Sequence, residues 1–294
     1  MRQIKSGRSL WLTVSILAGA LCAAVRRWQL STAFENEPHL SRPFAPASIV
    51  LTALLILSAV VLLLLARRQP VARSLRQNPG GIADAGGDTL FMGAMTAAAF
   101  LSLAAAPLLF NRGRQLRQVF EASKHYGAVT GGNNGILTLI AAVSAILAFA
   151  GLLMAGRAAY RNTSGQMALL LPTVSNCLWL MALYRENAAN PVRWDYSPLL
   201  LAVVCGILFY LDWTGLAADV PHPRRTLWLA GMTVVLSAAA LAGNWDGGSA
   251  LLLGSQLVSA LAFLWRVPEN LIHPPEPAAE PAQAEEKLEE NTHE

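Results

Sequence analysis

The feature that most constrains this chain is a series of eight apolar stretches, each 17 to 22 residues long. They cover residues 9–25, 47–66, 89–110, 135–156, 166–184, 197–214, 226–243 and 249–265. Each length is close to the roughly 20 residues that a helix needs to cross a hydrocarbon layer about 30 Å thick. Asp212 is the single charged side chain in all eight stretches, whereas helices of water-soluble proteins carry charges on their outer faces. The pattern therefore predicts a membrane-embedded protein.

Segments that cross a bilayer must satisfy their main-chain hydrogen bonds internally, so the eight stretches are predicted to be α-helices. The fold class expected is all-α, a polytopic transmembrane helix bundle of about eight spans within residues 1–265. Asp88, Asn134 and Ser164 precede apolar stretches and predict helix N-caps. The last two stretches are separated by only five residues, 244–248, which predicts an antiparallel hairpin. A re-entrant pair is the alternative.

Tryptophan supports these span boundaries independently of hydropathy. Seven of the eight tryptophans lie within a few residues of a predicted span end, and only Trp179 lies deeper. An amphipathic indole ring favours the headgroup level of a membrane. The seven are Trp11, Trp28, Trp194, Trp213, Trp228, Trp245 and Trp265.

The first stretch has two interpretations. Its basic start, apolar centre and small residues are typical of a signal peptide, with Ala18-Gly19-Ala20 as a candidate cleavage site. Against cleavage, the apolar run is long for a signal peptide, and Arg26 and Arg27 follow it in the manner of a stop-transfer flank. A retained first helix is the interpretation that we favour.

The distribution of Lys and Arg favours cytoplasmic N- and C-termini. With the N-terminus inside, 13 basic residues fall on the inner side and nine on the outer side, which follows the excess of positive charge in cytoplasmic loops. The basic segment 112–124, predicted as a loop, opposes this assignment because it would lie outside.

The last segment, residues 266–294, differs in composition from the rest of the chain. It is rich in Pro, Ala and Glu, with eight Glu against Arg266 and Lys287. Such a composition buries too little apolar surface to offset the entropy of ordering. The segment is predicted to be a disordered, acidic tail.

The inventory of chemically active side chains argues against an enzyme. The five histidines lie far apart outside the spans, and Cys22, Cys177 and Cys205 each lie in a different span, so no metal-ligand or redox spacing is present. No span contains His or Lys, which removes the partners that an intramembrane nucleophile needs. We expect no catalytic residue, no cofactor and no bound metal.

Partners follow from where the charge lies. The net charge of +4 is distributed as short basic groups between apolar stretches, whereas nucleic-acid binding needs basic residues gathered on a folded polar surface. The expected partner is the lipid bilayer. No nucleic-acid partner is expected, and a protein partner is not specified.

Polar residues inside the spans mark the one candidate site, an intramembrane polar site formed by Pro172, Asn176, Asp212 and Gln256. Pro172 removes a main-chain donor near the middle of its span, and the amide of Asn176 must find a partner in hydrocarbon. One interpretation is a broken helix that lines a solute path. The other is a kinked helix whose Asn bonds a neighbouring helix. For Asp212, near a span end, a solvated boundary residue and an ion-coupling acid both remain open.

Residues 89–96 and 226–233 share Thr, Leu, Met and Thr in register, which raises the hypothesis of a repeat of four helices. Two other motifs, residues 27–34 (RWQLSTAF) and Tyr184-Arg185-Glu186 with Asn190-Pro191 and Tyr196, resemble an uncharacterised family of multi-pass bacterial membrane proteins. That resemblance implies a bacterial cytoplasmic-membrane location and no assigned activity.

Two functions are consistent with these observations. The first is a non-enzymatic multi-pass membrane protein that acts as an interaction or sensory subunit. The alternative is a small-solute transporter or permease subunit with a polar site at the bilayer midplane. A cavity lined by the polar residues would favour transport, whereas a packed bundle in which they are satisfied pairwise would favour the first.

Overall fold

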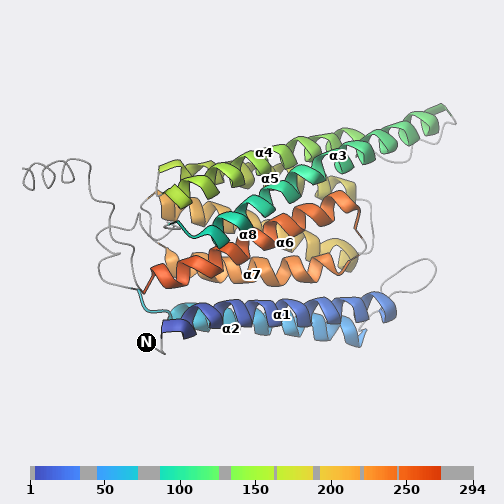
Figure 1. The fold of residues 1–294 in the computed structure, drawn as a ribbon. Coiled ribbons are helices and arrows are strands. Elements are labelled where there is room, and N and C mark those ends of the chain that lie inside the picture. Colours follow the sequence, from blue (N-terminus) through green and yellow to red (C-terminus); the bar gives the residue numbers. More distant parts are fainter. Residues whose placement is uncertain are drawn as a thin grey trace, which may run out of the picture.

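Each predicted apolar stretch coincides with a helix (Figure 1), although α7 ends two residues before the predicted end at residue 243. The computed structural model describes residues 4–33, 45–71, 87–125, 134–161, 164–187, 193–218, 222–243 and 245–272. In this part of the chain the α-helices are α1 (Ile4–Thr32), α2 (Pro46–Arg68), α3 (Thr89–His125), α4 (Asn134–Arg161), α5 (Leu170–Asn187), α6 (Arg193–Ala217), α7 (Pro223–Leu241) and α8 (Gly247–Asn270). A 3-10 helix, η3 (Ser164–Leu169), leads directly into α5. The expected all-α bundle is therefore confirmed.

Seven of the eight α-helices are long and apolar enough to cross a membrane, and α7 is the exception. Arg224 and Arg225 lie in its first turn, and its interior contains Thr233 and Ser237. The two arginines lower the mean hydropathy of this 19-residue helix, whose remaining sequence, residues 226–241, is apolar. Helix α7 packs against α1, α2, α6 and α8, and most of its side chains are buried.

The other helices surround this central one in layers (Figure 1). The α1–α2 pair covers one side of α7, and α6 and α8 pack on other sides. Further out, α3 packs on α8 and α4, while α5 lies between α4 and α6. The α7–α8 pair is an antiparallel hairpin, as predicted.

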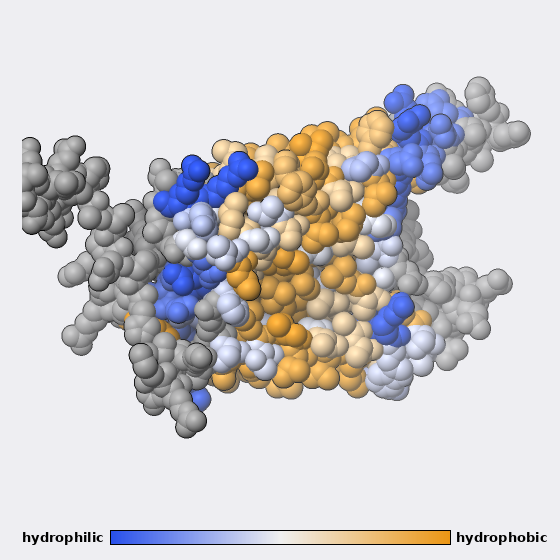
Figure 2. All heavy atoms as spheres, viewed as in Figure 1, coloured by the Kyte–Doolittle hydropathy of each residue, from blue (hydrophilic) through white to orange (hydrophobic). Residues whose placement is uncertain are grey.

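An apolar belt runs around the bundle, with hydrophilic residues at both ends (Figure 2). Large apolar side chains such as Leu17, Ile56, Phe100 and Val143 are more than half exposed. Side chains of this kind are exposed without cost only against lipid. Because successive helices alternate in direction, the start of α1 and the end of α8 lie at the same end of the bundle.

Every described α-helix except α7 continues past the predicted end of its span, and α3 does so by the greatest length. The segment 112–124, predicted as a loop, belongs to α3, which continues to His125; the loop prediction is wrong. Helix α1 continues to Thr32, and α8 to Asn270, so the first residues of the predicted tail are helical. Residues 273–294 lie outside the described residues. Hydropathy locates the edge of the hydrocarbon, but helical hydrogen bonding continues beyond that edge.

Not all tryptophans near the span ends face the membrane surface. Trp11 and Trp213 are only 1% exposed, and the Trp11 Nε1–H group donates to Gln69 Oε1 at 3.0 Å. Trp28 is well exposed at the end of α1, as predicted. Position along a helix predicts the depth of a tryptophan, but it does not tell which face of the helix packs against protein.

The helix neighbours do not follow a repeat of four helices. In the described part of the chain α6 packs along α7, whereas the corresponding pair in the first half, α2 and α3, are not neighbours. Helix α7 is also central, whereas α3 lies in an outer layer (Figure 1). This difference argues against the repeat hypothesis.

Close packing between α4 and the start of α5 depends on Gly151. A Cβ atom at this position would lie 2.7 Å from Leu171 Cβ and 2.8 Å from the carbonyl oxygen of Ala168. Distances this short require the main chain of the neighbouring segment to move.

We therefore expect Gly151→Ala to lower the free energy of unfolding by about 1–3 kcal/mol, measured by thermal or denaturant unfolding of the purified protein in detergent. Gly93→Ala is the matched control, because a Cβ there meets no atom within 4 Å. Equal effects of the two substitutions would contradict the packing described for Gly151.

Candidate functional site

Two of the four residues predicted for the polar site meet in the core of the bundle. Asn176 on α5 and Gln256 on α8 are 80 positions apart in the chain, and Asn176 Nδ2 donates to Gln256 Oε1 at 3.1 Å. Both side chains are buried, at 7% and 2% exposed. The prediction that the Asn176 amide finds a polar partner on another helix is therefore confirmed.

The amide nitrogen of Gln256 extends this contact to two more helices. It donates to the carbonyl oxygen of Ala202 on α6 at 2.7 Å and to Ser237 Oγ on α7 at 3.2 Å. We call Asn176, Ala202, Ser237 and Gln256 the amide cluster. Both hydrogens of the Gln256 amide and one lone pair of its oxygen are thus used within protein.

Gly206 gives Gln256 access to the main chain of α6. It lies one turn after Ala202, and a Cβ there would be 2.6 Å from Gln256 Nε2. A side chain at this position would therefore displace the amide from the Ala202 carbonyl. Even a methyl group does not fit, so the amide cluster is closely packed.

Nearby hydroxyl groups form further hydrogen bonds between helices. Ser255 Oγ donates to the carbonyl oxygen of Ala98 on α3 at 2.6 Å, and Ser175 Oγ donates to that of Ser144 on α4 at 2.6 Å. The hydroxyls of Tyr210 on α6 and Ser259 on α8 are 2.6 Å apart. Such bonds hold helices together in hydrocarbon, where water offers no competing partner.

Asp212 does not belong to the amide cluster. It lies six residues after Gly206, about 9 Å further along α6 at 1.5 Å per residue. Its carboxylate Oδ2 is 2.9 Å from Arg225 Nε at the start of α7, and the Arg225 side chain is 57% exposed. The Asp212 side chain is itself only 10% exposed, so it is not the solvated boundary residue of the first interpretation; it forms an ion pair that joins the end of α6 to the start of α7.

Pro172 is a packing residue near the start of α5, not a break in the middle of a helix. It is the third residue of α5, which follows η3 directly. Its buried ring fits against Gly151 of α4. Of the two interpretations, a break in the middle of a helix is not seen at this residue; the helix changes from 3-10 to α geometry just before it.

Sequence reasoning missed a buried polar group near the end of α1. Arg26, predicted as a flank of the first span, is fully buried. Its Nη1 donates to Gln29 Oε1 at 2.6 Å, and Gln29 Nε2 donates to Ser48 Oγ on α2 at 2.8 Å. The signal available was the four-residue helical repeat that continues Cys22 to Arg26 on one face.

The amide cluster contains only neutral amides, a hydroxyl and a main-chain carbonyl. These groups do not titrate near neutral pH, so the cluster supplies no general acid or base. Across the described residues no group of three or more His, Cys, Asp and Glu side chains is placed to hold a metal ion. The arrangement can bind helices to one another.

Two cavities in the described part of the chain lie away from the amide cluster. One is an apolar groove of about 810 Å³ between α3 and α4. The other, much smaller, lies beneath Arg112 and Thr138. Neither is lined by Asn176 or Gln256.

Comparison of the chain with known protein families, with curated proteins and with solved structures finds no match.

The bond between Asn176 and Gln256 can be measured with a double-mutant cycle. We expect Gln256→Leu to lower the free energy of unfolding by about 1–3 kcal/mol, because it leaves buried polar groups unpaired. With Asn176→Leu and the double variant, the coupling energy should be about 0.6–1.7 kcal/mol, measured by unfolding in detergent.

Thr52→Ala is the control for this cycle, since Thr52 Oγ1 bonds only within its own helix, to the Ser48 carbonyl. It should change stability little. A coupling energy of zero between Asn176 and Gln256 would show that the two amides do not pair.

Proposed function

We propose that this chain is a non-enzymatic, multi-pass membrane subunit that acts through contacts with other proteins. The proposal rests on one observation: the side-chain amide of Gln256 is hydrogen-bonded to three other helices inside a closely packed core. A solute path at this site would need the same groups to be free for a substrate. The alternative, a transporter, therefore requires the amide cluster to open and become hydrated.

The part of the molecule best placed for protein contact is the end of α3 beyond the apolar belt. We call residues 111–125 the α3 extension; at 1.5 Å per residue it is about 22 Å long. It projects beyond the other helices (Figure 1) and is hydrophilic (Figure 2). Gln115, Arg117 and Gln118 are exposed on it. Arg112, at its base, forms an ion pair with Asp246, the N-cap of α8.

For the location we propose a bacterial cytoplasmic membrane with both termini on the cytoplasmic side. The resemblance of residues 27–34 to a bacterial membrane-protein family supports the compartment. The greater number of Lys and Arg residues at the end that holds the start of α1 supports the orientation. The α3 extension is then on the outer side.

Single-cysteine labelling tests both the closed core and the orientation. In a background that lacks Cys22, Cys177 and Cys205, we expect Ser237→Cys to resist a membrane-impermeant thiol reagent until the protein is unfolded. Gln118→Cys should react in intact cells. Arg161→Cys, at the opposite end of the bundle, should react only after the membrane is permeabilised.

Each position has an outcome that contradicts the proposal. Reaction of Ser237→Cys in the native protein would favour the transporter. Reaction of Arg161→Cys but not Gln118→Cys in intact cells would show that the orientation is opposite to the one proposed.

Protein contact at the α3 extension can be tested by site-specific photocrosslinking in native membranes. A photoreactive residue at Gln118 should give a discrete adduct with another protein, identified by mass spectrometry, because the side chain is exposed beyond the apolar belt. Ile56 on α2 is the control, since it is 61% exposed and faces lipid. If Gln118 gives no more protein adduct than Ile56, the α3 extension is not the contact element.

A further inference from the structure

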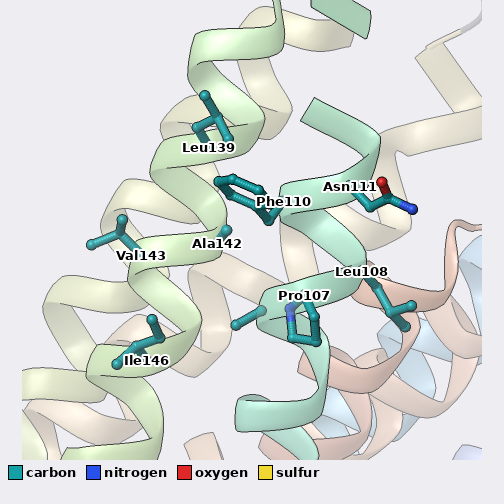
Figure 3. Close-up of a pocket in the computed structure, with 9 residues that line it drawn as sticks. Pro107, Leu108, Phe110, Asn111, Leu139, Ala142, Val143 and Ile146 are labelled. Carbon is teal, nitrogen blue, oxygen red and sulfur yellow. The ribbon is translucent and has the colours of Figure 1, made fainter. Parts of the chain in front are cut away.

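The groove between α3 and α4 lies on the outer face of the bundle, near the start of the α3 extension (Figure 3). We call it the α3–α4 groove. Its volume of about 810 Å³ falls in the range of small-molecule sites, roughly 300–1,000 Å³. Leu108, Val143 and Ile146, which line it, are about half exposed, so the groove opens toward lipid.

The sequence explains why the surface is hollow here. Pro107 lies inside α3, where proline removes a helical hydrogen bond and commonly kinks the helix. Ala106 on α3 and Ala142 on α4 also line the groove, and their small side chains leave space between the helices. Nearer the middle of the bundle, Phe100 of α3 packs against Phe149 of α4, and their ring centroids are 5.7 Å apart.

The groove is apolar along its length and polar at one end. Asn111 is one of the lining residues at that end, with its side chain on the side of α3 away from α4 (Figure 3), and it is the first polar residue after the apolar stretch 89–110. Arg114 follows three residues later, on the same helix face and one turn further from the membrane. An apolar groove with a cation beyond its polar end complements a lipid, in which a hydrocarbon chain is joined to an anionic headgroup.

The charge of Arg114 is available for such a headgroup. Of its neighbours on α3, Arg112 pairs with Asp246, and Arg117 Nε lies 3.9 Å from Glu121 Oε1. Arg114 is exposed, and its side chain forms no ion pair within the residues that the structure describes. A guanidinium binds phosphate through two parallel N–H donors.

We propose that the α3–α4 groove is a binding site for an anionic phospholipid. One acyl chain lies in the groove against Pro107 and Val143, and the phosphate lies at Asn111 and Arg114. A zwitterionic lipid fits the apolar part equally but gains less from Arg114. The site therefore selects the headgroup by charge and the chain by shape. This inference does not depend on a protein contact of the α3 extension.

The test uses the full chain purified in a neutral detergent. Native mass spectrometry and thermal unfolding compare added phosphatidylglycerol with phosphatidylcholine. The wild-type protein should retain phosphatidylglycerol preferentially. Arg114→Gln should bind it about fivefold more weakly, the effect of one basic residue near an anionic membrane surface, whereas Arg114→Lys should keep most of the preference.

Arg185→Gln is the matched control, because Arg185 is an exposed arginine in the last turn of α5, at the same end of the bundle. It should leave the preference unchanged. Val143→Trp, which fills the groove from α4, should weaken binding of both lipids.

Three results would overturn the proposal. Equal losses in Arg114→Gln and Arg185→Gln would mean that lipid is attracted by the general charge of this end. Unchanged binding in Val143→Trp would mean that no acyl chain uses the groove. Stabilisation by inorganic phosphate alone, equal to that by phosphatidylglycerol, would mean that the ligand is not a lipid.

Discussion

The side-chain amide of Gln256 contacts three neighbouring helices from one position on α8, and the arrangement of the bundle depends on this. Its oxygen accepts from Asn176 on α5, and its nitrogen donates to α6 and α7. In hydrocarbon an unpaired amide is costly, since no water can replace a lost partner. The relative depth of these helices is therefore fixed where they meet.

Small residues make that contact possible. Apolar side chains provide little force between helices in lipid, so association depends on close packing and interhelical hydrogen bonds. Because Gly206 has no side chain, the main chain of α6 is accessible to Gln256, and the absence of a side chain at Gly151 leaves space for the ring of Pro172. In the central helix α7, Gly231 and several alanines allow α1 and α2 to approach closely.

Polar contacts at both ends of the bundle complete the structure. At one end Asp88 caps α3 and accepts from the Trp265 indole of α8, and Asp212 pairs with Arg225. At the other end Arg112 pairs with Asp246. Near water such contacts add little to stability, but they join helices that are distant in sequence. The surface of α3 beyond Arg112 is left exposed for the proposed protein contact, and the proposed lipid site lies on α3 and α4 just before it.

The sequence by itself determined the medium, the helical class and the approximate positions of the eight helices, because water-free hydrocarbon imposes length and charge limits that composition reveals directly. It also identified Asn176 and Gln256 as residues that need partners, and Asp88 as a helix cap. Only the tertiary structure decided that these two amides pair with each other, that Asp212 and Pro172 lie outside their cluster, and that Ser237 and Gly206 belong at it. It likewise decided that Arg26, Trp11 and Trp213 face protein. An apolar helix has no charged face to mark its exposed side, so its orientation is set by neighbours distant in sequence.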